Sequence, residues 1–293
     1  MKPARFEYHA PSTVADVLAL LHEHGDEAKP LAGGQSLVPM LALRLTRFEH
    51  LIDLNRVPEL QGVQSTNGTI TVGGMTRQAS VGRDRQIADG VPLLARATPL
   101  IGHFQIRNRG TLGGSLAHAD PASEYPAVAM ALRAQFEVAS TAGQRTVAAD
   151  DFFVSTWTTA LEDDELLVAV HFPVWSGRCG FAIDEAARRH GDFAVVGTAC
   201  AVELGSDDRV ARVGLSLFGV GSTPVRAARA EDALVGLSAA ELLDGGLVEI
   251  GELALADCEP PDDIHASGHY RTQVGARLAA RALGHALEEA RRG

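Results

Sequence analysis

The stretch Leu31-Ala32-Gly33-Gly34-Gln35-Ser36-Leu37 contains a glycine pair followed by a small hydroxyl residue. A second pair stands eighty positions later, in Arg109-Gly110-Thr111-Leu112-Gly113-Gly114-Ser115-Leu116. Glycine permits positive φ and leaves no Cβ between the backbone and a ligand. Successive free N–H groups in such a turn form a concave donor cluster that suits phosphate oxygens. Two such turns could hold the two halves of a long dinucleotide, which one short loop could not span.

Neither glycine pair matches a standard nucleotide motif. No Gly-Lys-Ser/Thr follows, so neither is a P-loop. Neither fits Gly-x-Gly-x-x-Gly, so a Rossmann fold is not indicated. A single Gly-Gly is also explained by a tight turn between a strand and a helix. Two pairs with matching Ser-Leu flanks leave both interpretations open, a turn and a ligand loop.

The composition excludes several classes of protein. The chain has 293 residues, of which 46% are apolar and 22% charged, enough for two or three packed units. A net charge of −11 argues against nucleic-acid binding, because no basic surplus is present to neutralise phosphates. No apolar run is long enough to span a membrane, and the first residues do not resemble a signal peptide. We therefore expect a cytoplasmic protein with no membrane insertion.

Cysteine usage agrees with this expectation. Cys179, Cys200 and Cys258 are far apart, so neither a CxxC motif nor a disulfide framework is available. The same spacing argues against an iron–sulfur cluster on this chain.

The first segment is predicted to be helix, strand and loop. Thr13-Val14-Ala15-Asp16 has the pattern of a capping box, and Gly25 is expected to end the helix that follows. Short strands are predicted at 28–32, which leads into the first glycine pair, and at 51–54.

From about residue 60 the pattern becomes β-rich. Asn67-Gly68 predicts a tight hairpin between strands 62–66 and 69–73. The remaining elements of this α+β unit, with a sheet of four or five strands, are predicted as helices at 92–97 and 126–132 and strands at 136–138, 146–147 and 166–172.

A third unit is predicted beyond the loop Trp175-Ser176-Gly177. Residues 195–204 and 210–220 are expected to pair as antiparallel strands, and Ser267 to cap a closing helix. One face of that helix is expected to carry Tyr270, Val274, Leu278 and Ala282, and the other faces Arg271, Arg277 and Arg281.

No side-chain group in the sequence is predicted to perform difficult chemistry. His118, Asp120 and Glu124 lie within seven residues, but a loop that opens a helix at Pro121 explains them, and no partner ligand has metal-site spacing. A carboxylate here could instead accept hydrogen bonds from ribose or ribityl hydroxyls. No Gly-x-Ser-x-Gly nucleophile elbow is present. Phe193 is most simply a core aromatic. A bound cofactor should therefore supply the chemistry.

These motifs together resemble a known family. The segments 32–41 and 106–121 look like the two FAD loops of the medium, flavoprotein subunit of molybdenum hydroxylases, the carbon monoxide dehydrogenase and xanthine dehydrogenase family. The segment 187–197 resembles the family's next signature, and Tyr270-Arg271 with 281–283 resembles its closing helix. The match covers nearly the whole chain in the right order.

The resemblance implies an α+β fold of the vanillyl-alcohol-oxidase-like FAD-binding type. It implies FAD-binding subdomains at 1–58 and 59–175 and a C-terminal domain of antiparallel sheet and helices at 178–293. The implied FAD contacts are Pro30, Leu31, Ala32, Gly33, Gly34, Gln35, Ser36, Leu37, Thr111, Gly113, Gly114, Ser115, Ala119, Glu124 near the ribityl chain, Leu167 at the adenine end and Phe193 near the isoalloxazine.

The resemblance also implies partner chains. A large molybdopterin subunit would oxidise the substrate, and a small subunit with two [2Fe-2S] clusters would relay electrons to FAD here, in a dimer of heterotrimers. NAD, oxygen, a quinone or a carrier protein could accept the electrons. Two alternatives stay open: a non-catalytic adaptor that lost the flavin, and a stand-alone flavin oxidase.

Two features differ among family members. Asp184 stands at a position that is often lysine in the xanthine dehydrogenase branch, so contacts of that lysine are not transferred. Ser115 stands where the family often has asparagine. The isolated cysteines exclude the branch with an iron–sulfur insertion in this subunit.

Overall fold

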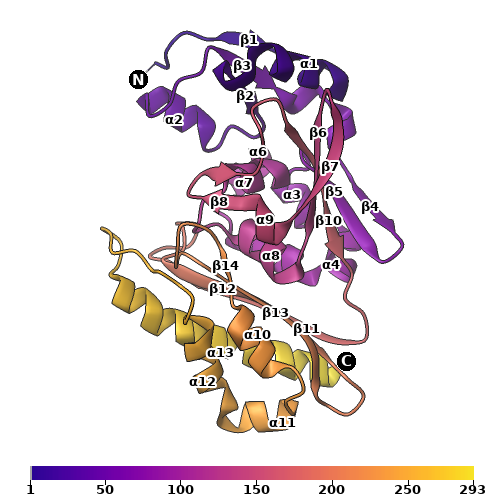
Figure 1. Cartoon of the computed structure of the whole chain (residues 1–293), viewed down its shortest axis with the longest axis vertical. Helices are drawn as coiled ribbons and strands as arrows, with labels where there is room; N and C mark the ends of the chain where they lie inside the picture. The colour runs from indigo at the N-terminus through magenta and orange to yellow at the C-terminus, as the bar shows by residue number, and fades with distance from the viewer. Residues whose placement is uncertain (1) are drawn as a thin grey trace.

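A computed structural model describes residues 2–293. Its N-terminal part, at the top of Figure 1, is a three-stranded parallel sheet in the order β1-β3-β2. A small core of its own, built around Val17, Leu21 and Ile52, lies beneath α1. The elements are β1 (Glu7–His9), α1 (Val14–His24), η1 (Gly25–Glu27), β2 (Ala28–Leu31), α2 (Leu37–Leu43), β3 (His50–Asp53), η2 (Leu54–Arg56) and η3 (Pro58–Leu60).

The predicted helix boundaries in this part are confirmed. Thr13 caps α1, and its Oγ1 accepts a hydrogen bond from the Asp16 N–H at 3.1 Å. Gly25 ends the helix with φ +51°, a conformation that favours glycine. The two predicted strands are β2 and β3.

The middle of the chain folds around a five-stranded antiparallel sheet in the order β4-β5-β10-β6-β7. Asn67 and Gly68 both have left-handed φ, which matches the predicted hairpin turn between β4 and β5. The strands are β4 (Val63–Thr66), β5 (Thr69–Gly73), β6 (Gln135–Ser140), β7 (Gly143–Ala148) and β10 (Leu166–Pro173), with a separate pair β8 (Phe153–Ser155) and β9 (Thr158–Thr159).

Helix α8 (Glu124–Leu132) joins the middle of the chain to the C-terminal part. All nine of its residues are buried, and it packs between β10 and the strands of the last sheet. A Cβ at Gly214 would lie 1.9 Å from the Ala131 carbonyl oxygen, so only glycine permits this approach. The other helices here are α3 (Gln78–Val81), α4 (Arg85–Gly90), α5 (Pro92–Ala97), η4 (Thr98–Leu100), α6 (Phe104–Arg109), α7 (Leu112–His118) and α9 (Ala149–Phe152).

The C-terminal part is a four-stranded antiparallel sheet, β11-β12-β13-β14, with helices on one face (Figure 1). Its other face shares a core with α8 through Phe181, Ala199 and Phe218. The elements are β11 (Arg178–Ala186), β12 (Val196–Leu204), β13 (Val210–Phe218), β14 (Val225–Arg226), α10 (Ala228–Leu234), α11 (Ala239–Glu241), η5 (Leu242–Gly246), α12 (Leu247–Ala254) and α13 (Gly268–Arg292).

Strand β11 was not anticipated from the sequence. It carries the adjacent charges Asp184 and Glu185, and it contains Gly180, which weakens the strand pattern. The glycine is required because a Cβ there would lie 1.8 Å from the Ala286 carbonyl oxygen of α13. Asp184 accepts a hydrogen bond from Arg281 Nη2 of α13 at 2.7 Å, so this acidic residue in β11 is paired.

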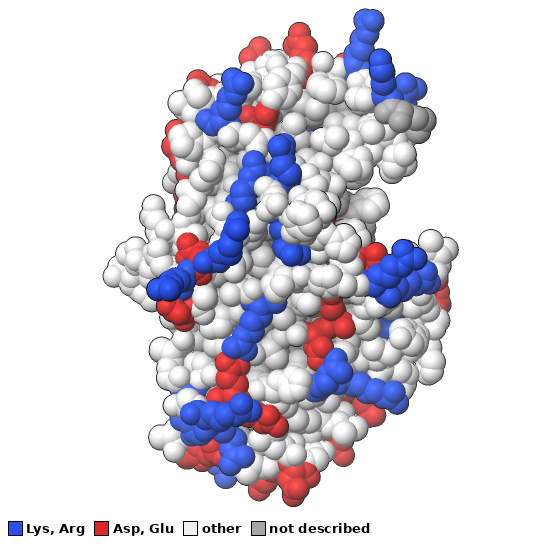
Figure 2. All heavy atoms as spheres, turned by 180° about the vertical axis from the view of Figure 1, so that it is seen from behind, with Lys and Arg blue, Asp and Glu red and all other residues white. Residues whose placement is uncertain are grey.

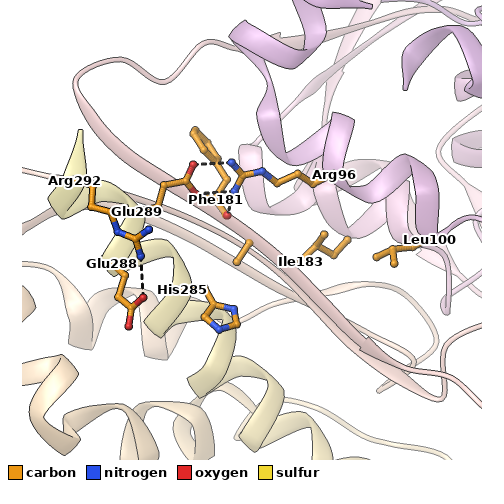
Figure 3. A pocket seen from close by; sticks show the side chains of 9 residues that line it. Arg96, Leu100, Phe181, Ile183, His285, Glu288, Glu289 and Arg292 are labelled. Atoms are coloured by element: carbon orange, nitrogen blue, oxygen red, sulfur yellow. Dashed lines mark hydrogen bonds and ion pairs between the residues drawn. The ribbon is translucent and has the colours of Figure 1, made fainter. Parts of the chain in front are cut away.

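An ion pair also ties the middle of the chain to α13. Arg96, at the end of α5, donates two hydrogen bonds of 2.6 Å to the Glu289 carboxylate (Figure 3). Glu289 also accepts from the Phe181 N–H at 3.0 Å. The hydrogen bonds from Arg96 hold the pKa of Glu289 below its ordinary value.

Charges of both signs are spread over the surface. In Figure 2, basic and acidic side chains lie next to one another over the lower, C-terminal half of the face shown. Asp208, for example, lies 2.7 Å from Arg178 and 3.2 Å from Arg291. None of the helices in the described part of the chain has the length and apolarity needed to cross a lipid bilayer.

The expectation for Arg271 was wrong. Its side chain is buried, although the sequence suggested an outward-facing position. The guanidinium donates to the carbonyl oxygens of Val195 and Gly219, the latter at 3.0 Å, and to Asp263 at 2.7 Å. It therefore holds the start of β12 and the end of β13 together. Such a role depends on contacts between distant segments, which helical spacing does not reveal.

We expect Arg271→Met to lower the free energy of unfolding by about 2–5 kcal/mol, because it leaves two buried carbonyls without their donor. Arg277→Met is the matched control in the same helix. Arg277 is exposed, and its change should stay within about 0.5 kcal/mol. Urea denaturation of both variants measures the loss in free energy of unfolding. Equal losses would contradict the proposed role of Arg271 in holding β12 and β13 together.

Candidate functional site

The first glycine turn lies at the carboxyl end of β2, beside the carboxyl end of β3. In a parallel sheet these strand ends share one edge, which is the usual position of a ligand crevice. A cavity of about 510 Å³ opens at this edge. Its lining residues are Tyr8, Leu31, Ala32, Gly33, Gly34, Gln35, Val38, Pro39, Asp53, Asn55 and Arg109.

The first turn presents unused donors. Within residues 2–293, the N–H groups of Gly33, Gly34, Gln35 and Ser36 donate to no other protein group. Gly34 has φ +73°, which curves the backbone into the concave shape of an anion-binding turn. Arg109 adds a positive charge to the cavity wall. The residues present therefore suit a negatively charged group such as a diphosphate.

The two glycine turns lie side by side, as a shared dinucleotide site requires. A Cβ on Gly33 would be 2.4 Å from the Arg109 carbonyl oxygen and 2.7 Å from the Cα of Gly110. A Cβ on Gly114 would be 3.2 Å from the Cβ of Ala32. The segment Arg109–Gly110, which precedes the second turn, therefore packs directly on the first turn.

The second glycine pair is not a donor cluster, and that part of the expectation was wrong. It forms the first turn of α7, which Thr111 caps: Thr111 Oγ1 accepts from the Gly114 N–H at 3.0 Å. The Gly113 N–H donates to the Gly74 carbonyl at 2.8 Å, and a Cβ on Gly113 would lie 2.7 Å from the same oxygen. Here the glycines permit close packing of α7 on the end of β5.

A hydrogen-bond network next to the cavity holds the first turn in position. Asn55 Nδ2 donates to the Ala32 carbonyl at 3.1 Å and also to Asp53. Tyr8 donates to Asp53, and Arg77 donates to Asn55 Oδ1 and, from another nitrogen, to the Arg109 carbonyl. The network thereby links all three strands of the first sheet with the second glycine segment.

Asp53 is ionised within this network. Burial raises its pKa, but the hydrogen bonds from Tyr8 and Asn55 outweigh burial and hold the pKa below its ordinary value. Tyr8, Asp53, Asn55 and Arg77 were not predicted as site residues from the sequence. Asp53 lies near the end of a predicted strand and Asn55 directly follows it, and polar residues at that place were the available signal.

Beyond the second turn, the buried carboxyl group of Glu124 interacts with the half-buried carboxyl group of Glu185. Burial raises the pKa of Glu124 to about 8, and the charges of Glu185 and Asp120 add to the shift. Burial also raises the pKa of Glu185, to about 7. Glu185 Oε2 is buried and has no hydrogen-bond partner within residues 2–293. A donor such as a hydroxyl group would satisfy this oxygen.

The other predicted contacts lie outside the cavity lining. Pro30, Ser36 and Leu37 flank it in sequence. Phe193 is 61% exposed, so the core-aromatic interpretation of this side chain was wrong. Leu167 lies at a bulge of β10, where the neighbouring Val168 carbonyl accepts from the Gly74 N–H at 2.7 Å. The cavity lining also omits Thr111, Gly113, Gly114, Ser115, Ala119 and Glu124.

A second cavity, of about 530 Å³, lies between α5, β11 and α13 (Figure 3). Arg96 pairs with Glu289 there, and Arg292 donates to Glu288 at 3.1 Å. No glycine turn opens into this cavity. The cavity at the first glycine turn is therefore the better candidate for an anionic ligand.

The pKa of Glu124 predicts a pH effect on stability. The folded chain keeps this proton up to about pH 8, whereas the unfolded chain releases it near the ordinary value of 4.5. Stability should therefore fall as the pH rises through this window. We compare FAD-free Glu124→Gln with the FAD-free unmodified chain. The difference in their free energies of unfolding should shift in favour of the variant as the pH rises from 5 to 9, by at most about 5 kcal/mol.

Urea denaturation at pH 5, 7 and 9 measures this gain. Exposed Glu23→Gln is the control and should leave the pH dependence unchanged. A stability difference for Glu124→Gln that is the same at all three pH values would contradict the prediction.

Comparison with known proteins assigns the family. Residues 4–175 match the family model "FAD binding domain in molybdopterin dehydrogenase", and residues 181–286 match "CO dehydrogenase flavoprotein C-terminal domain". The chain is 38% identical to the carbon monoxide dehydrogenase medium chain of Hydrogenophaga pseudoflava, over 97% of both chains. It is 39% identical to the 6-hydroxypseudooxynicotine dehydrogenase complex subunit alpha of Paenarthrobacter nicotinovorans, over 99% of this chain and 97% of the relative.

Solved structures agree. Carbon monoxide dehydrogenase from Hydrogenophaga pseudoflava superimposes with a TM-score of 0.94 at 38% identity, covering 99% of both chains. Quinoline 2-oxidoreductase from Pseudomonas putida 86 superimposes with a TM-score of 0.91 at 36% identity, also covering 99% of both chains. The α+β fold with an FAD-binding module and a C-terminal flavoprotein domain is thereby confirmed. This chain belongs to the family of FAD-binding medium subunits of molybdenum-dependent dehydrogenases, which are oxidoreductases.

Proposed function

We propose that this chain is the FAD-carrying electron-transfer subunit of a heterotrimeric molybdenum hydroxylase. It would take electrons from an iron–sulfur subunit with two [2Fe-2S] clusters and pass them to an external acceptor. A large molybdopterin subunit would oxidise the organic substrate. The observation that carries this proposal is the row of unpaired N–H groups from Gly33 to Ser36, three of which belong to residues that line the cavity.

In this proposal the first glycine turn holds the diphosphate of FAD. The row of N–H groups and Arg109 supply the donors and positive charge that a diphosphate needs. Asn55 and Arg77 keep the turn in place. The redox chemistry is supplied by bound FAD, so no side chain of this chain needs to act as a catalytic acid or base.

The other contacts extend the proposed site from this turn. We assign Glu124 the role of accepting hydrogen bonds from ribityl hydroxyls, Leu167 that of supporting the adenine end, and Phe193 a position near the isoalloxazine. The full proposed set is Pro30, Leu31, Ala32, Gly33, Gly34, Gln35, Ser36, Leu37, Thr111, Gly113, Gly114, Ser115, Ala119, Glu124, Leu167 and Phe193. Because the Gly113 and Gly114 amides are already used, we assign the second turn a packing role beside FAD.

The proposal also includes the division of the chain into domains, its assembly with other subunits and its location in the cell. We assign residues 1–58 and 59–175 to two FAD-binding subdomains and residues 178–293 to the C-terminal domain. The names of the relatives, a medium chain and a complex subunit, support assembly with a large and a small subunit, in a dimer of heterotrimers. The three free cysteines fit a cytoplasmic location.

Replacing Gly34 should remove the cofactor. Gly34→Val places a branched side chain on a residue with φ +73°, next to Val38 and Leu31 in the cavity wall. We expect FAD to bind at least about tenfold more weakly, a loss of about 1.4 kcal/mol. Fluorescence titration of the FAD-free chain measures the affinity.

Gly68→Val is the matched control. Gly68 has φ +76° in the β4–β5 hairpin, with open space around it, so the backbone strain is the same but the cavity is untouched. FAD binding should be unchanged in this variant. If the unmodified chain binds no FAD, the adaptor alternative is correct instead.

The isolated flavin-loaded chain should not react with organic substrates. Carbon monoxide, caffeine, nicotine and glyceraldehyde appear in the names of the relatives' enzymes. We expect none of them to bleach the flavin absorbance of this chain under anaerobic conditions, because substrate oxidation takes place on another subunit. Dithionite is the positive control. Rapid bleaching by any of the four compounds would favour the stand-alone oxidase.

A further inference from the structure

Three histidines from three separate elements meet on the N-terminal sheet. His9 is the last residue of β1, His50 the first of β3, and His24 the last of α1. One ring nitrogen of each lies within 4.8 Å of the ring nitrogens of the other two. Side chains alternate along a strand, so His9 faces away from Tyr8 and from the FAD cavity.

A carboxylate completes the group. Glu7 lies two residues before His9 and pairs in register with His50. Its Oε2 is 3.4 Å from His50 Nδ1 and 3.9 Å from His9 Nε2. Within residues 2–293, the ion-pair partners of Glu7 are histidines, and no lysine or arginine is among them.

The spacing of these atoms matches a tetrahedral metal site. Zinc bound at about 2.0–2.1 Å holds its ligand atoms about 3.3 Å apart. His9 Nε2 and His50 Nδ1 are 3.1 Å apart, and with Glu7 Oε2 they form a triangle with sides of 3.1, 3.4 and 3.9 Å. This triangle has the size of one face of the tetrahedron.

His24 supplies the fourth corner after a side-chain rotation. Its ring stacks on His50, with ring centroids 3.7 Å apart and planes 6° apart. Lone pairs of parallel rings do not converge, so His24 must turn about its χ angles to reach the same ion. It is half-buried at the end of α1, next to Gly25, where an added Cβ would meet no atom within 4 Å, so there is room for that turn.

A single hydrogen bond between neutral His9 and His50 also explains their contact, without a metal. That hydrogen bond does not explain why Glu7 and His24 also lie close to the same two ring nitrogens. Imidazole nitrogens with one carboxylate oxygen are a ligand set that suits zinc and similar divalent transition metals.

We propose that Glu7, His9, His24 and His50 bind one divalent transition-metal ion of the zinc class. The ion joins the three-residue strand β1 to β3 and to the end of α1. Because β1 also carries Tyr8, which bonds to Asp53 in the cavity wall, the ion stabilises the N-terminal wall of the FAD cavity from the opposite face of the sheet.

The test uses the full-length, flavin-loaded chain without an affinity tag, first stripped of metal with a chelator. Zinc is titrated in competition with a chromophoric chelator, and thermal unfolding is followed with and without zinc. We expect one zinc ion per chain and a higher melting temperature with zinc. His9→Gln and His50→Gln should each weaken zinc binding at least about tenfold.

Two further variants make the result decisive. His22→Gln is the control in the same helix, since His22 points to Asp164 outside the cluster, and its zinc affinity should be unchanged. Glu7→Gln changes a 73% exposed side chain, so it tests the ligand set even if a histidine variant fails to fold. Sub-stoichiometric zinc, or equal affinity in His22→Gln, Glu7→Gln and the cluster variants, would overturn the proposal.

Discussion

The backbone contact between Gly33 and the segment Arg109–Gly110 is the constraint on which the candidate site depends. No residue with a Cβ fits there, because that atom would lie 2.4 Å from a carbonyl oxygen. The contact places the chain of the first glycine turn against the segment that precedes the second. Arg77 reinforces it by donating to both Asn55 and the Arg109 carbonyl. The spacing of the two turns is thus set by main-chain contact and by the side chains of Arg77 and Asn55, which preorganises the site for a large cofactor.

Two turns with similar sequences perform different physical tasks. In the first, the N–H groups of the cavity-lining residues Gly33, Gly34 and Gln35 have no protein partner within residues 2–293. In the second, Thr111 caps a helix and Gly74 accepts a further N–H, so the same residue type serves close packing. A glycine pair in a sequence therefore indicates that backbone approaches something closely. It does not indicate whether the neighbour is a ligand or another part of the chain.

The C-terminal sheet completes the molecule on the other side of α8. Its inner face shares a core with that helix, and buried Arg271 holds the ends of β12 and β13 beside the loop that carries Phe193. Glu185 of β11 and Glu124 of α8 interact electrostatically across this joint, and burial raises the pKa of both carboxyl groups. Carboxyl groups with raised pKa values can donate as well as accept hydrogen bonds, which suits a hydroxyl-rich ligand.

The sequence by itself determined the features that depend on neighbours in the chain. The Thr13 and Ser267 caps, the Asn67-Gly68 turn and the two glycine pairs are local signals, and the structure has helices and turns at each. Tertiary structure alone decided that Arg271 is buried, that β11 joins the last sheet, and that Tyr8, Asp53, Asn55 and Arg77 form one network. It also decided that His9, His24 and His50 meet. These outcomes depend on pairs of residues far apart in the chain, and periodicity and capping carry no information on such pairs.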